Sequence, residues 1–117
     1  FLQNCWMGVS QPGPADVAAG DVLGPDRFMW GSDYPHDEGT YPFTREHLRQ
    51  AFAGVSSEQL AGLLAGNAAK LYDFDLDALL PLAAKLGPTV DELAQPLTEL
   101  PENPNGALLK GVLGAPV

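Results

Sequence analysis

The densest group of side chains able to do chemistry lies in one short polar segment, residues 32–38, which reads Ser-Asp-Tyr-Pro-His-Asp-Glu. It follows the apolar run 28–30, Phe-Met-Trp, which is typical of a strand covered on both faces. Asp33 therefore stands just past the end of a predicted strand, where barrel enzymes carry their catalytic groups. Its carboxylate could bind a divalent cation or act as a general base on a metal-bound water. His36 could be a ligand, a proton shuttle or a hydrogen-bond partner of Asp33.

The same residues also allow structural interpretations. An Asp between a strand and a proline-containing loop is often a turn residue, and spacing alone favours that interpretation of Asp33. His36, in a polar loop, is more often solvated, and His47, on a predicted helix, is expected at the surface. Cys5 is expected to pack as a small apolar side chain. One Asp and one His are too few to hold a metal, which generally needs three or four protein ligands.

Composition limits the classes of partner. Six Lys and Arg against 15 Asp and Glu leave a net charge of -9, which repels phosphate backbones and anionic membranes. No apolar run approaches the roughly 20 residues needed to cross a bilayer, and nothing at the N-terminus resembles a signal peptide. The single cysteine, Cys5, cannot form an intramolecular disulfide, which favours the cytoplasm. We expect a small-molecule substrate and no nucleic-acid or membrane partner, and we leave open a homo-oligomer of the full-length protein.

Two strands must position the polar segment. Residues 1–10 predict one buried strand, and residues 28–30 predict the second. Between them, residues 15–24 indicate a short helix that Gly24-Pro25 would end. The order of strand, helix, strand and further helices fits an α/β arrangement.

Further helices are predicted after the polar segment. Their signals are a Thr44 cap before residues 45–52, a capping box at Ser56, a helix stop at Gly66, a cap at Asn67, a helix starting at Pro81 and a cap at Thr89. Residues 75–80 are interpreted as a turn, because a proline inside a helix removes a hydrogen bond. Residues 96–117 show no usable periodicity and are expected to form a loose tail.

Two motifs in this chain resemble a known family. The stretch Arg27–Phe43, RFMWGSDYPHDEGTYPF, resembles the last barrel strand and following loop of the amidohydrolase-related family, also called amidohydrolase 2. That family includes metal-dependent hydrolases and decarboxylases similar to aminocarboxymuconate-semialdehyde decarboxylase. The segment Gly66–Tyr72, GNAAKLY, is similar to the family's closing signature. The motifs occur in the expected order, and the resemblance covers about residues 1–95.

The resemblance implies a (β/α)8 TIM barrel, with residues 1–10 as its seventh strand and 27–32 as its eighth. Residues 1–95 would then be the C-terminal part of the barrel domain. It also implies that Asp33 binds the metal or activates its water, and that His36 supports this role by orienting a ligand. The implied cofactor is a divalent metal, with zinc as the first choice.

The implied reaction of the complete enzyme is hydrolysis of a C–N or C–O bond through a metal-activated water. Non-oxidative decarboxylation is the close second, and a non-catalytic α/β interaction module is an alternative from another class. The family's His-X-His pair and its histidines on middle strands have no counterpart in this sequence. We therefore expect this fragment to be inactive by itself.

Overall fold

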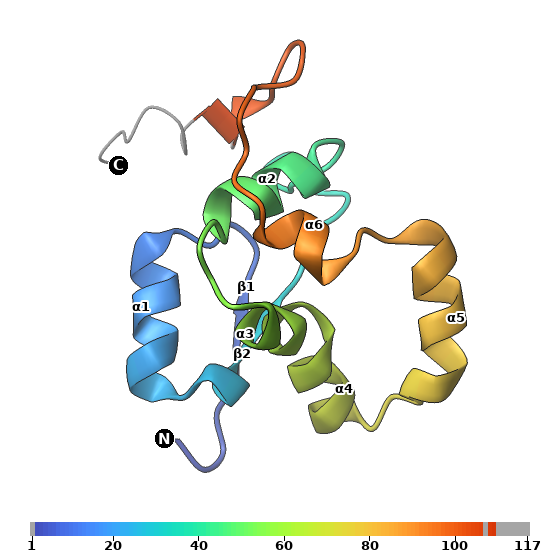
Figure 1. The fold of residues 1–117 in the computed structure, drawn as a ribbon. Coiled ribbons are helices and arrows are strands. Elements are labelled where there is room, and N and C mark those ends of the chain that lie inside the picture. Colours follow the sequence, from blue (N-terminus) through green and yellow to red (C-terminus); the bar gives the residue numbers. More distant parts are fainter. Residues whose placement is uncertain (1, 107, 110–117) are drawn as a thin grey trace.

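The computed structural model describes residues 2–106 and 108–109, in which a small parallel sheet is surrounded by helices (Figure 1). Strands β1 (Met7–Val9) and β2 (Phe28–Trp30) pair in parallel, with Met7 opposite Phe28. Helix α1 (Pro14–Leu23) and the short 3-10 helix η1 (Pro25–Arg27) connect them. The chain thus forms the predicted strand–helix–strand unit of an α/β protein.

The first strand is shorter and more exposed than predicted. Only Met7–Val9 form a strand, and Met7 and Gly8 are exposed. Trp6 is 37% exposed, and the guanidinium carbon of Arg27 lies 4.7 Å from the centroid of its ring. Within the described residues the sheet consists of β1 and β2, so the face and outer edge of β1 lack the cover that a buried parallel strand has.

The helices after β2 enclose an apolar core. They are α2 (Thr44–Ala51), α3 (Ser57–Ala61), the π-helical turn η2 (Gly62–Gly66), α4 (Asn67–Tyr72), α5 (Leu76–Leu86) and α6 (Val90–Ala94). The core cluster of Leu48, Phe52, Leu60 and Leu93 is at most 3% exposed, and Trp30 packs against it. Leu48 and Phe52 share one helix face, as their spacing predicts. No described helix is long and apolar enough to cross a membrane.

Two of the four predicted N-terminal helix caps, Ser56 and Thr89, are present, and the other two, Thr44 and Asn67, are wrong. The Ser56 hydroxyl oxygen accepts a hydrogen bond from the backbone N–H of Gln59, and Thr89 caps α6 in the same way. Thr44 is instead the first residue of α2, and its hydroxyl oxygen lies 3.0 Å from that of the buried Thr40. Thr44 therefore links the helix to the preceding loop and does not cap it.

Gly66 does not end a helix. Its φ is -61°, and the chain continues from η2 directly into α4, which ends at Tyr72 and is followed by Asp73 with a left-handed φ of 57°. Asn67 is not a cap either. Its side-chain N–H groups donate to the carbonyl oxygens of Pro25 and Phe28, both at 2.7 Å, and so fix the helix against the start of β2.

Helix α5 is continuous, so the predicted break before Pro81 is wrong. A proline at this position removes the N–H that would bond to the carbonyl of Asp77. Every residue of α5 is exposed, so that carbonyl can be solvated and the loss is tolerated. Asp75 caps the start of the helix, and its carboxylate accepts a hydrogen bond from Ala78 N–H at 3.1 Å.

The predicted tail, residues 96–117, lies partly outside the described residues, which omit 107 and 110–117. In the described part, Leu108 is 0% exposed, and its N–H donates to the side-chain oxygen of Asn105 at 3.0 Å.

Candidate functional site

Asp33 lies three residues beyond Trp30, the last residue of β2, at the carboxyl end of the parallel pair. Its φ is 56°, a left-handed conformation that Asp adopts more readily than most residues. Its carbonyl oxygen accepts the N–H of His36 at 2.8 Å, which closes a turn. The turn leaves the Asp33 carboxylate 40% exposed. Asp33 therefore both forms a turn and presents a carboxylate to solvent.

The structure brings the two predicted site residues together. His36 Nδ1 lies 3.4 Å from Asp33 Oδ2, and the His36 side chain is 75% exposed. This separation is long for a charged hydrogen bond, and an exposed pair of this kind contributes little to stability. The contact can orient the carboxylate, and the imidazole is open to solvent.

The backbone of the loop that carries Asp33 is closely packed. The N–H of Thr40 donates to the Ser32 carbonyl at 3.2 Å, and the N–H of Gly39 donates to the His36 carbonyl at 2.9 Å. Gly39 is buried, and a Cβ built there would lie 2.9 Å from each of those two carbonyl oxygens. Only glycine fits this approach. Gly39 thus allows the close backbone packing that fixes the turn presenting Asp33, because it has no side chain.

The loops after the two strands meet. Gln11, which follows β1, donates its side-chain amide to the backbone carbonyl of Glu38. Beyond Asp33, the rings of Tyr34 and Tyr41 make an edge-to-face contact at 5.4 Å, and each side chain is 67% exposed. The carboxyl ends of neighbouring parallel strands thus form one rim, as in barrel enzymes.

His47 contradicts its predicted exposure. It is 5% exposed, and its Nδ1 has no hydrogen-bond partner among the described residues. Burial lowers the pKa of His47 below its usual 6.5, because a desolvated imidazolium is disfavoured. A helical stripe in the sequence could have revealed this burial, since five positions follow the i, i+3, i+4, i+7, i+8 pattern: Thr44, His47, Leu48, Ala51 and Phe52.

The donors available for a metal are few. No group of three or more His, Cys, Asp or Glu side chains in residues 2–106 and 108–109 is placed to hold a metal ion. Asp33 and His36 offer an oxygen and a nitrogen that suit zinc, but two donors do not complete a site. Cys5 is free and half-buried rather than fully packed. The described residues therefore do not by themselves fit a metal, and they supply at most part of its coordination.

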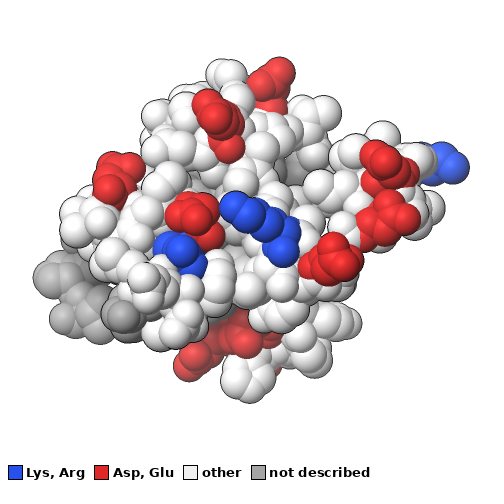
Figure 2. All heavy atoms as spheres, turned by 90° about the horizontal axis from the view of Figure 1, so that it is seen from below, with Lys and Arg blue, Asp and Glu red and all other residues white. Residues whose placement is uncertain are grey.

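The surface charge is mostly negative. Asp and Glu side chains are spread over the face shown in Figure 2, with few Lys or Arg among them. Arg45 is one of the paired cations, with its Nη1 3.2 Å from a carboxylate oxygen of Glu92. A surface of this charge attracts cations and repels anions.

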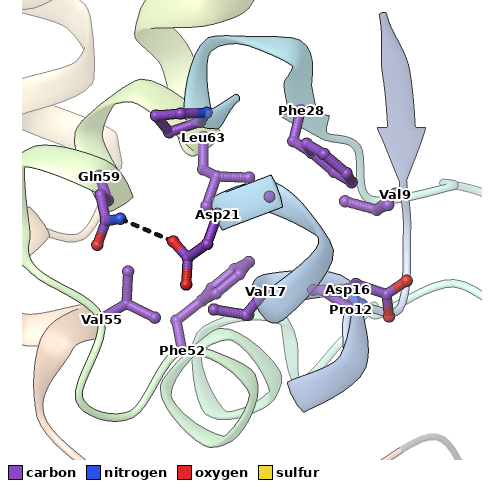
Figure 3. A pocket seen from close by; sticks show the side chains of 12 residues that line it. Val9, Pro12, Asp16, Val17, Asp21, Phe28, Phe52, Val55, Gln59 and Leu63 are labelled. Carbon is purple, nitrogen blue, oxygen red and sulfur yellow. Dashed lines mark hydrogen bonds between the residues drawn. The ribbon is translucent and has the colours of Figure 1, made fainter. Parts of the chain in front are cut away.

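A small pocket, partly open to solvent, lies apart from the Asp33 loop. It measures about 30 Å³ and is lined mainly by apolar side chains, including Val9, Phe28 and Phe52, as Figure 3 shows. Asp21 at its edge accepts a hydrogen bond from the Gln59 amide at 3.4 Å. The space holds about one water molecule and is too small for an organic substrate.

Comparison with known proteins gives one match. The family model described as Amidohydrolase matches residues 8–74, which is more than half of the chain. The matched range contains β2, the Asp33 loop and the segment Gly66–Tyr72. No curated protein and no solved structure matches the chain.

Proposed function

This chain belongs to the amidohydrolase family, and from that premise we propose that it supplies the Asp33 carboxylate to the active site of a metal-dependent hydrolase. The bond cleaved is a C–N or C–O bond. The observation that carries the proposal is the placement of Asp33, just past β2 on a turn closed by hydrogen bonds, with its carboxylate open to solvent. Barrel enzymes carry their catalytic groups at this end of their parallel strands.

Asp33 acts in proton transfer. As a carboxylate it accepts a proton from the water that attacks the scissile carbon, and it returns the proton to the leaving nitrogen or oxygen. His36 lies 3.4 Å from one carboxylate oxygen, which leaves the other oxygen free for this exchange. A divalent metal, zinc by preference, supplies Lewis-acid polarisation when bound, and ligands besides those described here must complete its site.

The fold supports a place for this chain within a larger barrel. A parallel β1–β2 pair connected through α1 is the repeating unit of a (β/α)8 barrel. Two three-residue strands leave open edges and an exposed face on β1, which further strands would cover. We propose that the chain contributes the last two strands of such a barrel.

The test is Asp33→Asn in the enzyme that contains this chain. Hydrolysis of a panel of p-nitrophenyl esters and anilides should fall by about 100-fold or more, because the substitution removes the base. The control is Asp37→Asn, an exposed acid in the same loop, which should leave turnover unchanged. Near-normal turnover in Asp33→Asn with full metal occupancy would exclude this role for Asp33.

A further inference from the structure

Two exposed tyrosines lie on the loop that presents Asp33. The rings of Tyr34 and Tyr41 have centroids 5.4 Å apart and are inclined at 74°, and each side chain is 67% exposed. Tyr34 directly follows Asp33 in the chain, so their Cα atoms are about 3.8 Å apart. Tyr41 follows Thr40, whose N–H donates to the Ser32 carbonyl at 3.2 Å. The loop therefore brings both tyrosines to the turn that carries the carboxylate.

The backbone under these rings is held in place, although the rings are exposed. Thr40 is 0% exposed, and its hydroxyl oxygen lies 3.0 Å from that of Thr44 at the start of α2. The carbonyl of Tyr41 accepts the side-chain amide of Asn105 at 3.5 Å. Tyrosine has few rotatable bonds, so a ring on a fixed backbone loses little conformational entropy when a ligand binds. Exposed rings held in this way are suited to binding.

The charge of the chain indicates which ligand the rings bind. Residues 28–44, which include the whole loop, contain no Lys or Arg, and the chain carries a net charge of -9. Such a surface attracts cations. The face of an aromatic ring also attracts a cation within about 6 Å of its centroid, and centroids 5.4 Å apart allow one cation to satisfy this limit for both rings. The charge and the ring geometry therefore favour the same kind of ligand.

We propose that Tyr34 and Tyr41 bind an alkylammonium group of the substrate while Asp33 acts on the neighbouring bond. This inference rests on the hydrolase function that we propose, and it names the substrate class: amides or esters that carry an ammonium group near the cleaved bond. The ring faces supply the attraction, so the tyrosine hydroxyls are not required for it.

Two other roles for the tyrosine pair predict different behaviour. An edge-to-face contact can stabilise the loop by itself, and a pair with only that role would affect charged and uncharged ligands alike. A pair that binds any hydrophobic group would also not distinguish charge. A second exposed aromatic pair, Tyr72 at the end of α4 and Phe74, has ring centroids 5.8 Å apart and lies outside the Asp33 loop. Tyr72 therefore provides a matched control.

The test is calorimetric binding of two non-hydrolysable ketones to the enzyme that contains this chain. The ketones differ in one group, which is trimethylammonium in one and its uncharged isostere, tert-butyl, in the other. We expect the charged ketone to bind about 5- to 30-fold more tightly. Tyr34→Leu and Tyr41→Leu should each reduce this preference by about 2- to 5-fold, with little effect on the uncharged ketone. Tyr34→Phe and Tyr41→Phe should retain the preference, and so should the control Tyr72→Leu.

Equal affinity for the two ketones, or no binding of the charged one, would overturn the proposal. An equal loss of both ketones in the leucine variants would also overturn it, because that result indicates a structural or purely apolar role. Ketone binding requires no turnover, so this test is separate from the hydrolysis test. Equal ketone affinities would leave the role of Asp33 intact, whereas near-normal hydrolysis by Asp33→Asn would exclude that role and leave the ketone preference intact.

Discussion

Several leucine side chains are buried in the part of the described protein outside α5, here called the body, whereas those of helix α5 are exposed. In the body, Leu48, Leu60 and Leu93 are at most 3% exposed, whereas every leucine of α5 is at least 41% exposed. Both regions have the apolar spacing of amphipathic helices. In the body, α6 packs against both α2 and α3, so their apolar faces cover one another. Helical spacing therefore predicts an apolar face, and burial requires a second element opposite that face.

Several hydrogen bonds that join distant segments of the body are also shorter than the one at the end of α5. In the body, Arg49 donates to the carbonyl of Pro96 at 2.8 Å, and Asn67 donates to two carbonyls at 2.7 Å. At the end of α5, the carbonyl of Leu86 accepts from Arg45 at 3.5 Å, a much weaker contact. The body is thus held by packing and hydrogen bonds together, and α5 depends mainly on its own helical bonds.

The largest expected effect tests the packing difference directly. Leu60→Ala should lower the free energy of unfolding by about 2–5 kcal/mol, because it opens a cavity in the core. Leu82→Ala, at an exposed position, should change it by less than about 0.5 kcal/mol. Urea unfolding followed by circular dichroism measures both. Equal losses would show that α5 is buried in solution and would remove the contrast.

The next effect concerns the hydrogen bonds that join α4 to the strand region. Asn67→Ala should cost about 2–3 kcal/mol, since it leaves the carbonyls of Pro25 and Phe28 without their donor. The control is Asn4→Ala, at an exposed position, which should be close to neutral. The same urea experiment measures this difference, and a neutral Asn67→Ala would mean that packing alone holds the body.

A somewhat smaller effect is expected in the Asp33 loop. Gly39→Ala should cost about 1–3 kcal/mol, because the added Cβ would press on the carbonyl oxygens of Ser32 and His36. Gly31→Ala is the matched control in the same loop, where a Cβ would meet nothing within 4 Å. Thermal melts of both variants would compare the two sites. Tolerance of alanine at position 39 would show that the loop is less rigid than the body.

The smallest effect depends on pH. Because burial lowers the pKa of His47 in the folded state, the imidazole binds its proton more readily in the unfolded chain. Stability should be highest above about pH 6.5 and should fall below it by at most about 1.4 kcal/mol per pH unit. His47→Leu should lack this component. An unchanged pH profile in that variant would show that His47 is solvated, as α5 is.

The sequence predicted the features that depend on local chemistry. Ser56 and Thr89 cap their helices because a hydroxyl next to free N–H groups needs no distant partner. The apolar run 28–30 forms β2, and the Leu48 and Phe52 face enters the core. Asp33 and His36 also lie together as expected, since they stand three positions apart in one tight turn.

The sequence failed where tertiary contacts decide. Asn67 has a side chain suited to capping, yet it donates to the segment that begins β2. Pro81 usually interrupts a helix, but exposure of α5 allows its unpaired carbonyl to be solvated. His47 was expected at the surface but lies beside Leu48 on the buried stripe. That stripe is visible in the sequence only when small and polar positions are counted together with the apolar ones.

The contact between Gly62 and Asn67 has a consequence for how related sequences should vary. A Cβ at position 62 would lie 3.3 Å from the side-chain oxygen of Asn67, so the glycine leaves room for the amide that reaches Pro25 and Phe28. Substitutions at positions 62 and 67 should therefore be coupled. Where a homologue carries a bulky residue at position 62, we expect Asn67 to be replaced as well, and an alignment of such homologues should show the two columns changing together.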